Sequence, residues 1–283
     1  MEVVSTIEAL HTRLGGERKI AFVPTMGNLH EGHLALMKLA RKHAPCVVAS
    51  IFVNRLQFGP TEDFTKYPRT LEEDCAKLKS HGVDVLFAPD EDALYPVPQR
   101  VMVDLPPVAD DLCGKFRTGH FRGVATVVLK LFNIVRPQIA VFGKKDYQQL
   151  FIIREMVREL NLPIAIVAGE TMRDADGLAL SSRNSYLSAA ERPEAVCLYR
   201  TLVYIKERIE AWEMDFGRLQ ENADKTLDSH GWLVDYVAVR KNSTLEPAQP
   251  ADKDLVVLGA AWLGKIRLID NLEVCIMDPV ELY

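Results

Sequence analysis

Short apolar runs rich in β-branched residues alternate with longer helical patterns through residues 19–170. This alternation constrains the fold most strongly, because each run suits a buried strand and the longer stretches can carry a helix back across a sheet. It predicts a doubly wound parallel α/β sheet whose ligands bind beyond the carboxyl ends of the strands. The expected strands are KIAFVP (19–24), CVVASIFV (46–53), VDVLFAP (83–89), VMVDL (101–105), QIAVFG (138–143) and PIAIVAGE (163–170).

The stretches between the runs carry helix signals. Thr70 and Glu73 have the spacing of a capping box, which opens a helix towards His81. Two more helices are expected at 124–136 and 146–160, because a proline follows shortly beyond each.

The pattern changes after Asp174. Ser188 and Glu191 are spaced to cap a long helix, and a second helix is expected at 216–230. Helices followed by strands indicate a smaller α+β domain. We place the boundary at the Asp176 turn, which gives domains of residues 1–175 and 176–283. The expected strands of the second domain are LVDYVAVR (233–240), DLVVLGAAW (254–262) and KIRLID (265–270).

Charge and cysteine usage exclude several classes of partner. The formal net charge of −5 gives no basic face for nucleic acid or an anionic membrane. No apolar run reaches the roughly 18 residues of a membrane span. The five cysteines are scattered and never form a CxxC pair, so neither a disulfide framework nor a zinc site is predicted. We therefore expect a cytoplasmic protein that acts on small molecules, without a dedicated metal site.

The most informative stretch is PTMGNLHEGHLALMKLA, residues 24–40, where a strand ends, a turn follows and a helix begins. The N-terminus of such a helix favours an anion, since its N–H groups and dipole point into the turn. His30 and His33 place imidazole donors beside that anion, and Gly32 lets a nucleotide approach the backbone. The spacing differs from HExxH, which excludes a zinc-protease site. The alternative is that both histidines only cap the helix.

This turn resembles the HxGH motif of the nucleotidylyltransferase superfamily, and TMGNLHEGH is similar to pantothenate synthetases. The resemblance extends over roughly residues 19–271. It implies a Rossmann-like first domain and an ATP-dependent enzyme that joins pantoate to β-alanine. In that reaction the pantoate carboxylate attacks the α-phosphorus of ATP, which gives pantoyl adenylate and pyrophosphate, and the amine then displaces AMP. The resemblance also implies a homodimer. Mg²⁺ is expected on the phosphates, held largely by them and by water. Because the acyl adenylate is hydrolysable, we expect the second domain to close over the site and exclude water.

Two further stretches carry the resemblance. Gln57, in SIFVNRLQFGPTEDFTKYPRT (50–70), matches a glutamine that contacts pantoate, and the β-alanine site overlaps it. The family usually has proline where Arg55 stands, and we expect Arg55 to point into solvent. The segment VFGKKDYQQL (141–150) matches an ATP-binding turn with a second pantoate-binding residue, Gln149. Taken alone, Asp146 in this turn would be expected to cap the following helix.

The last stretch, MRDADGLALSSRNSYL (172–187), looks like the counterpart of a mobile phosphate-binding loop in superfamily relatives. Glu73 and Asp74, in contrast, are expected on a solvated helix face. The expected catalytic residues are His30, His33, Lys145 and Arg183. The expected ATP-binding residues are Met26, Gly27, Asn28, Leu29, His30, Glu31, Gly32, His33, Gly143, Lys144, Lys145, Asp146, Met172, Leu180, Ser181, Ser182 and Arg183, and the expected substrate-binding residues are Gln57 and Gln149.

Three other functions compete with this interpretation. A related HxGH transferase would attack ATP with a phosphate rather than a carboxylate, and the paired glutamines with GHFRG (119–123) argue against it. An aminoacyl-tRNA synthetase would need a KMSKS-like loop, an anticodon domain and a basic surface. A non-catalytic nucleotide sensor would not require both histidines together with Lys145 and Arg183.

Overall fold

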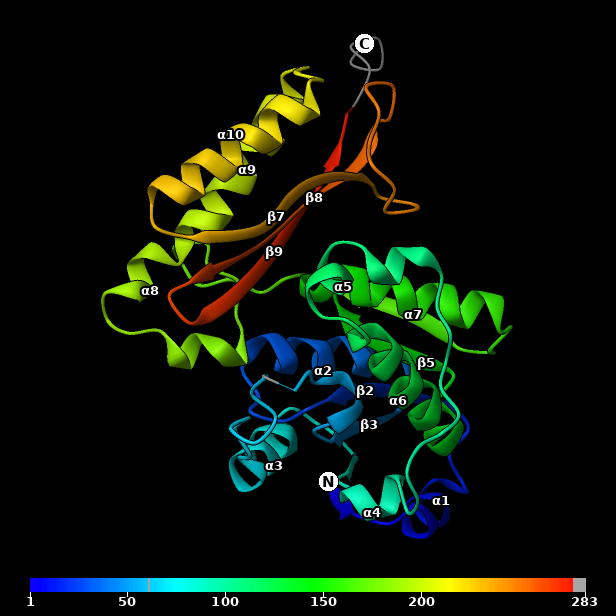
Figure 1. The fold of residues 1–283 in the computed structure, drawn as a ribbon. Helices are drawn as coiled ribbons and strands as arrows, with labels where there is room; N and C mark the ends of the chain where they lie inside the picture. The colour runs from blue at the N-terminus through cyan, green and yellow to red at the C-terminus, as the bar shows by residue number, and fades with distance from the viewer. Residues whose placement is uncertain (61, 277–283) are drawn as a thin grey trace. The chain divides into compact units, whose positions relative to one another are not determined.

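The computed structural model describes residues 1–60 and 62–276. The chain divides into two compact units, residues 1–172 and residues 173–283 (Figure 1). The boundary expected from the sequence, after residue 175, lies three residues beyond this division. In the described part of the chain, no helix combines the length and the apolar character that crossing a membrane requires.

A six-stranded sheet with only parallel pairs forms the centre of the first unit. Its strand order is β1-β4-β3-β2-β5-β6, so the predicted doubly wound fold is confirmed. In the central register, Ala21 lies beside Val47 on one side and Ile139 on the other. The strands are β1 (Glu2–Val4), β2 (Ile20–Thr25), β3 (Cys46–Ile51), β4 (Val85–Phe87), β5 (Ile139–Gly143) and β6 (Ala165–Gly169).

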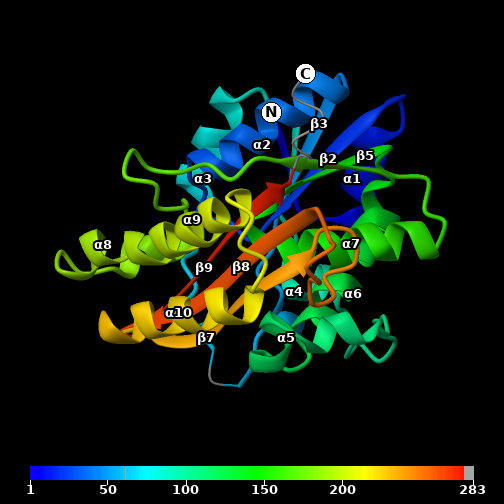
Figure 2. The same ribbon diagram turned by 90° about the horizontal axis from the view of Figure 1, so that it is seen from above.

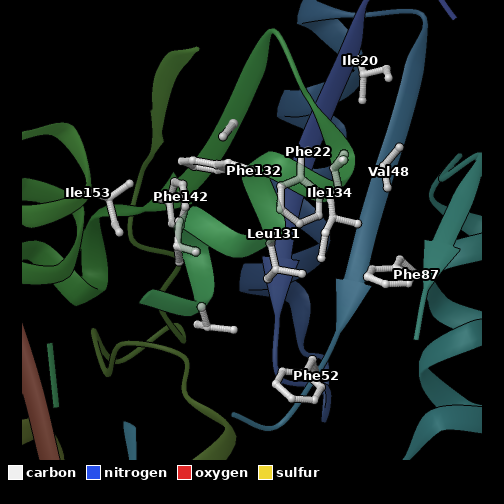
Figure 3. Close-up of a cluster of buried hydrophobic side chains, with 14 of the residues drawn as sticks. Ile20, Phe22, Val48, Phe52, Phe87, Leu131, Phe132, Ile134, Phe142 and Ile153 are labelled. Carbon is white, nitrogen blue, oxygen red and sulfur yellow. The ribbon is translucent and has the colours of Figure 1, made fainter. Parts of the chain in front are cut away.

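Both faces of this sheet are buried, which explains why its strands are apolar throughout. Alternate residues of β2 enter different cores: Phe22 packs in one, and Ala21 and Val23 in the other. Phe132 makes edge contacts with Phe22 and with Phe142, at centroid distances of 6.5 and 6.3 Å (Figure 3). Helices α1 (Ile7–Leu14), α6 (His120–Val135) and α7 (Tyr147–Glu159) contribute to the first core, and α2 (Glu31–His43) and α3 (Leu71–Ser80) to the second.

The strand order reverses between β2 and β5. From β2 the chain moves through α2 to β3 on one side, whereas β5 is followed by β6 on the other. The carboxyl ends of β2 and β5 are thus neighbours at a topological switch point, the place where open α/β sheets bind their ligands. The histidine turn follows β2, and the turn at residues 144–146 follows β5.

The second unit contains a three-stranded antiparallel sheet in the order β7-β8-β9. Helices α9 and α10 pack on this sheet and on each other (Figure 2). Ser188 and Glu191 form the expected capping box, with each backbone N–H bonded to the other side chain. The helix they open is interrupted at Ala195. The elements are α8 (Glu191–Glu194), α9 (Val196–Glu210), α10 (Phe216–Ser229), β7 (Leu233–Lys241), β8 (Asp254–Leu263) and β9 (Ile266–Cys275).

One predicted strand of the first unit is wrong. The run VMVDL (101–105) is not a strand: Val101 is 80% exposed, and the backbone N–H of Val103 bonds to the Thr126 hydroxyl rather than to a neighbouring strand. The edge strand is instead β1, at the chain start, whose three residues are too short to give a pattern. Short turns of helix connect the elements of the first unit: α4 (Glu91–Leu94), α5 (Cys113–Phe116), and 3₁₀ turns at Arg55–Gln57, Pro107–Asp110 and Lys144–Asp146. The second unit has a 3₁₀ turn at Ser182–Tyr186.

The capping box expected at Thr70 and Glu73 is also absent. Thr70 occupies the N-cap position of α3 but makes no side-chain capping bond. Its hydroxyl donates instead to the Asp74 carboxylate, at 3.1 Å. The hydroxyl therefore bonds to a side chain in the first turn of the same helix rather than to a backbone N–H of the helix end.

A buried ion pair ties the beginning of the second unit to its sheet. Arg173 donates two hydrogen bonds to Asp270 on β9, at 2.6 and 2.8 Å. The Arg173 guanidinium also lies 4.3 Å from the centroid of the Tyr199 ring. Asp270 is only 5% exposed, so its charge depends on this partner.

Replacing Arg173 by alanine is expected to destabilise the second unit by about 3–5 kcal/mol, because a buried carboxylate loses its counter-charge. Thermal unfolding checks this, with Arg192→Ala as the matched control. Arg192 pairs with Asp174 and Asp176 at an exposed position, where such pairs contribute about 0–1 kcal/mol. Equal losses in the two variants would contradict the assignment.

Candidate active site

His30 and His33 bond to the backbone at the start of α2, each through one ring nitrogen. His30 is the N-cap residue, and its Nδ1 accepts from the Gly32 N–H at 3.1 Å. His33 Nδ1 accepts from the His30 N–H at 3.3 Å, which closes a reciprocal capping box. The two rings lie 4.1 Å apart. Since Nδ1 accepts in both rings, each neutral imidazole carries its proton on Nε2, which remains a donor.

Both rings are held neutral. Burial, reinforced by His33 and Lys145, lowers the pKa of His30 to about 3. Burial also lowers the pKa of His33 to about 4; the charge of Asp146 opposes this shift, and Lys145 and Lys77 add to it. A buried group with cations nearby keeps its uncharged form. The histidines therefore offer hydrogen bonds, not positive charge.

Glycine at position 32 makes room for the His30 ring. A Cβ there would lie 2.9 Å from His30 Cε1 and 3.8 Å from Cβ of Met172, so the turn also lies beside Met172. Gly27 has φ +85°, and a Cβ there would lie 3.1 Å from the Asp74 carboxylate. These two contacts explain why the turn carries glycine at both positions.

The buried carboxylate of Asp74 holds this turn, contrary to the expectation of a solvated helix face. Asp74 is 0% exposed. It accepts from the backbone N–H groups of Asn28 and Leu29, both at 2.8 Å. Glu73, its neighbour, is exposed as expected. The sequence missed Asp74 because α3 is rich in acids, and nothing in the local pattern distinguishes the one that reaches a turn 45 residues away.

The turn after β5 carries two lysines, and one of them, Lys145, lies near the histidines. Lys144 pairs with Glu170 at 2.7 Å. Lys145 Nζ lies 4.0 Å from Asp146, and its charge contributes to the low pKa of both His30 and His33. Asp146 stands at the N-cap of α7 but makes no side-chain capping bond, so the expectation from position alone is wrong. The predicted turns after β2 and β5 therefore do meet in the structure.

Gln57 lies against the histidine turn. Its Nε2 donates to the Met26 sulfur at 3.2 Å, and its Oε1 accepts from Asn54 at 3.1 Å. The Asn54 side chain also donates to the Gly123 carbonyl and accepts from the Tyr95 hydroxyl. Gln57 is only 8% exposed, so its amide is fixed by neighbours rather than solvated.

The motif GHFRG contacts the backbone of the same glutamine through His120. Arg117 donates to Nε2 of His120, whose Nδ1–H is therefore left to donate to the Gln57 carbonyl, at 2.8 Å. Burial and the Arg117 charge lower the pKa of His120 to about 4. Arg117 also forms two hydrogen bonds with Glu62, both at 2.7 Å. At Gly123 a Cβ would lie 2.1 Å from the Leu56 carbonyl oxygen, so only glycine permits this contact.

The two neighbouring glutamines of α7 differ in their surroundings. Gln148 is buried and structural: it accepts from the Cys113 N–H and donates to the carbonyls of Val108 and Asp111. Gln149, the residue expected to bind substrate, is partly buried beside it.

Arg55 is exposed, as expected for a side chain that faces solvent. It pairs with Glu91 at 3.1 Å, with 64% of its side chain accessible, and its guanidinium lies 5.1 Å from the Phe64 ring centroid. The preceding Asn54 has φ −84° and ψ 109°, the extended conformation that a following proline requires. Asn54 thus has the backbone conformation of a residue that precedes proline, although arginine follows it.

The remaining predicted residues, Leu180 to Arg183, lie in the second unit. The Ser181 hydroxyl accepts from the Arg183 N–H at 3.2 Å and so opens a short 3₁₀ turn. Among the described residues, one group has the side chains and spacing to hold a metal ion: Glu194, Cys197 and His230. Glu194 already accepts from Trp232 and contacts His230. Burial raises the pKa of the Cys197 thiol, which disfavours the thiolate that a metal would bind. We therefore assign no metal to this group.

A six-stranded parallel sheet with an HxGH turn at its switch point defines the class of this protein, a Rossmann-like nucleotide-binding α/β enzyme. Residues 2–273 match the family model of pantoate–β-alanine ligase. The chain is 64% identical to a pantothenate synthetase of Nitrosospira multiformis over 97% of its own length and 98% of the relative's. It belongs to the pantoate–β-alanine ligase family.

Solved structures agree with this assignment. The pantothenate synthetase of Thermus thermophilus superposes with a TM-score of 0.93 at 45% identity, covering 97% of this chain and 100% of that one. The pantoate–β-alanine ligase of Francisella tularensis, complexed with β,γ-ATP and β-alanine, gives a TM-score of 0.77 at 35% identity over 96% and 97% of the two chains. The chain is therefore a ligase.

The low histidine pKa values predict acid sensitivity. Unfolded histidines take up a proton near pH 6.5, whereas folded His30, His33 and His120 do so only near pH 3–4. Their contribution to the unfolding free energy is therefore complete above pH 6.5 and is lost as the pH falls from there towards 4, by up to about 1.4 kcal/mol per pH unit for each ring. Urea unfolding should show a shallower decline in His33→Gln. Ring titration near pH 6.5 in NMR spectra would contradict this.

Replacing Arg55 by proline should leave the KM for pantoate level or lower. The substitution should stabilise by about 0.4–1 kcal/mol through the unfolded state, an effect that loss of the exposed contacts with Glu91 and Phe64 partly offsets. Arg55→Pro should therefore be more stable than Arg55→Ala, which loses the same contacts without that gain. Steady-state kinetics and thermal unfolding check this; a tenfold rise of KM in both variants would show that Arg55 binds an anion.

Proposed function

We propose that this chain joins pantoate to β-alanine with ATP in two steps, at the meeting of the turns after β2 and β5. The pantoate carboxylate first attacks the α-phosphorus of ATP and releases pyrophosphate. The β-alanine amine then attacks the acyl carbon of pantoyl adenylate and releases AMP. The observation that carries this proposal is the pair of neutral histidines at the N-terminus of α2, next to Lys145.

The first step brings an anion onto a polyanion, so the task of the protein is to neutralise charge and position groups. Lys145 supplies a fixed cation beside the turn. His30 and His33 supply Nε2–H donors whose direction is set by the bonds their Nδ1 atoms accept. Neutral donors have an advantage here, because they can stabilise developing charge on the phosphates without releasing a proton at neutral pH.

The other side of the site suits pantoate. Gln57 is held at both ends of its amide, by Met26 and by Asn54. An amide fixed in this way offers a defined donor and acceptor to a substrate that carries hydroxyl and carboxylate groups. Gln149 on α7 is proposed as the second such amide. β-Alanine is proposed to bind alongside Gln57.

Mg²⁺ is proposed to enter with ATP, held mainly by phosphate oxygens and water, where it would neutralise phosphate charge. Asp74 is not proposed as its ligand, because both carboxylate oxygens already accept from the protein. Leu180 to Arg183 are proposed to reach the phosphates when the second unit closes and excludes water from the reactive adenylate. A cytoplasmic homodimer is proposed on the family resemblance alone.

Pyrophosphate exchange into ATP tests the two-step mechanism. Exchange is expected with pantoate present and β-alanine absent, because the adenylate forms before the amine is needed. His33→Ala should slow this exchange by about 10²-fold or more while remaining folded, since the donor it removes acts mainly in the transition state. Lys42→Ala, at an exposed position on the same helix, is the control and should exchange normally. An exchange that strictly requires β-alanine would overturn the mechanism.

A further inference from the structure

The backbone amides at the start of the histidine turn point at an anion that the protein itself supplies. Gly27 and Asn28 have φ values of +85° and +50°. The backbone N–H groups of Asn28 and Leu29 in this turn converge on one anion, as successive amides in a turn can. The anion here is the Asp74 carboxylate, whose Oδ2 accepts from Asn28 and whose Oδ1 accepts from Leu29, both at 2.8 Å. These two amides are therefore occupied by protein and are not donors for phosphate.

One turn further along α3, a lysine bonds to the peptide group between Leu29 and His30. Lys77 Nζ donates to the Leu29 carbonyl at 2.8 Å. The N–H of the same peptide unit belongs to His30 and donates to His33 Nδ1. A single rigid peptide plane thus joins Lys77 to the His33 ring. Helix α3 fixes the histidine pair through one peptide on each side of Leu29.

We propose that Asp74 is a positioning residue for the adenylation step, which holds the backbone of residues 28–29 so that His30 and His33 point their Nε2–H groups at the phosphates. This inference rests on the proposed function. Asp74 is 0% exposed and three donors surround its carboxylate, including the Thr70 hydroxyl, so it does not itself touch substrate. A small displacement of a catalytic group costs a large factor in rate: about 10²-fold for about 1 Å.

A carboxylate is required because two N–H groups must be accepted side by side. An asparagine at position 74 has nearly the same shape but only one accepting oxygen, and its NH₂ would face the second backbone N–H. That arrangement leaves buried donors opposed to each other. Asp74→Asn therefore disturbs the turn without opening a cavity.

The central experiment is single-turnover formation of pantoyl adenylate by Asp74→Asn. Its rate is expected to fall about 10- to 100-fold, as the displacement of a catalytic group implies. Glu73→Gln makes the same charge change one residue away, at an exposed position, and should keep the wild-type rate. A wild-type rate in folded Asp74→Asn would overturn the proposal.

A double-mutant cycle separates positioning from general damage. If Asp74 acts through the histidines, Asp74→Asn should slow adenylation little further once His33 is already alanine. Fully additive losses would overturn the proposal. Should Asp74→Asn fail to fold, Lys77→Met serves instead, because it removes the bond to the Leu29 carbonyl and keeps the apolar stem. The same loss of adenylation rate is then expected, and the same non-additivity with His33→Ala. An unchanged rate would overturn the proposal.

A readout that does not depend on catalysis distinguishes failure of this inference from failure of the proposed function. In ¹⁵N NMR spectra the His33 ring of the wild-type protein should show a single Nε2–H tautomer, and Asp74→Asn should show a mixture of tautomers. Absence of pyrophosphate exchange in the wild-type protein would reject the proposed function while this comparison still decides the role of Asp74. An unchanged tautomer in Asp74→Asn would overturn the positioning role.

Discussion

The reversal of strand order between β2 and β5 is the constraint on which the rest of the first unit depends. Parallel strands on either side of that point send their chains to opposite sides, so no connection covers the adjoining carboxyl ends. Everything chemically distinctive in this unit converges there: the histidine turn after β2, the lysine turn after β5, and Gln57 in the segment after β3. The order of the strands therefore sets the position of the site, and the side chains set its chemistry.

Capping and chemistry are not alternatives for His30 and His33. A capping histidine uses Nδ1 as an acceptor, and the same bond decides that the proton of the neutral ring resides on Nε2. Burial next to Lys145 then removes protonation from the physiological range. The structural role thereby prepares the donor that the reaction needs. His120 is fixed in the opposite tautomer, because Arg117 occupies its Nε2, and it serves the backbone of Gln57.

The sequence predicts those parts of the structure that local chemistry determines. Five of the six predicted strands of the first unit exist, since strands buried on both faces are apolar throughout, and the HxGH turn follows from a strand, a glycine and a helix start. VMVDL has the same local composition but no neighbouring strand, so composition alone misplaced it. The contact of Asp74 with Leu29, the Arg117–Glu62 pair and the bond from His120 to Gln57 join residues 45 or more apart in the sequence, which no local pattern records.

The bonds from the Asn28 and Leu29 amides to Asp74 also change where phosphate charge can be received. A glycine turn before a helix suggests backbone amides cradling a phosphate, yet Asp74 accepts from two of those amides and places a buried negative charge behind them. A phosphate is therefore more favourably met further along, where the positive end of the α2 dipole, the imidazole Nε2 donors and Lys145 provide positive potential. Lys77, bonded to the Leu29 carbonyl, adds a cation that offsets the carboxylate near the rings. The carboxylate thus gives the turn its shape, and the helix end and Lys145 give it its attraction for anions.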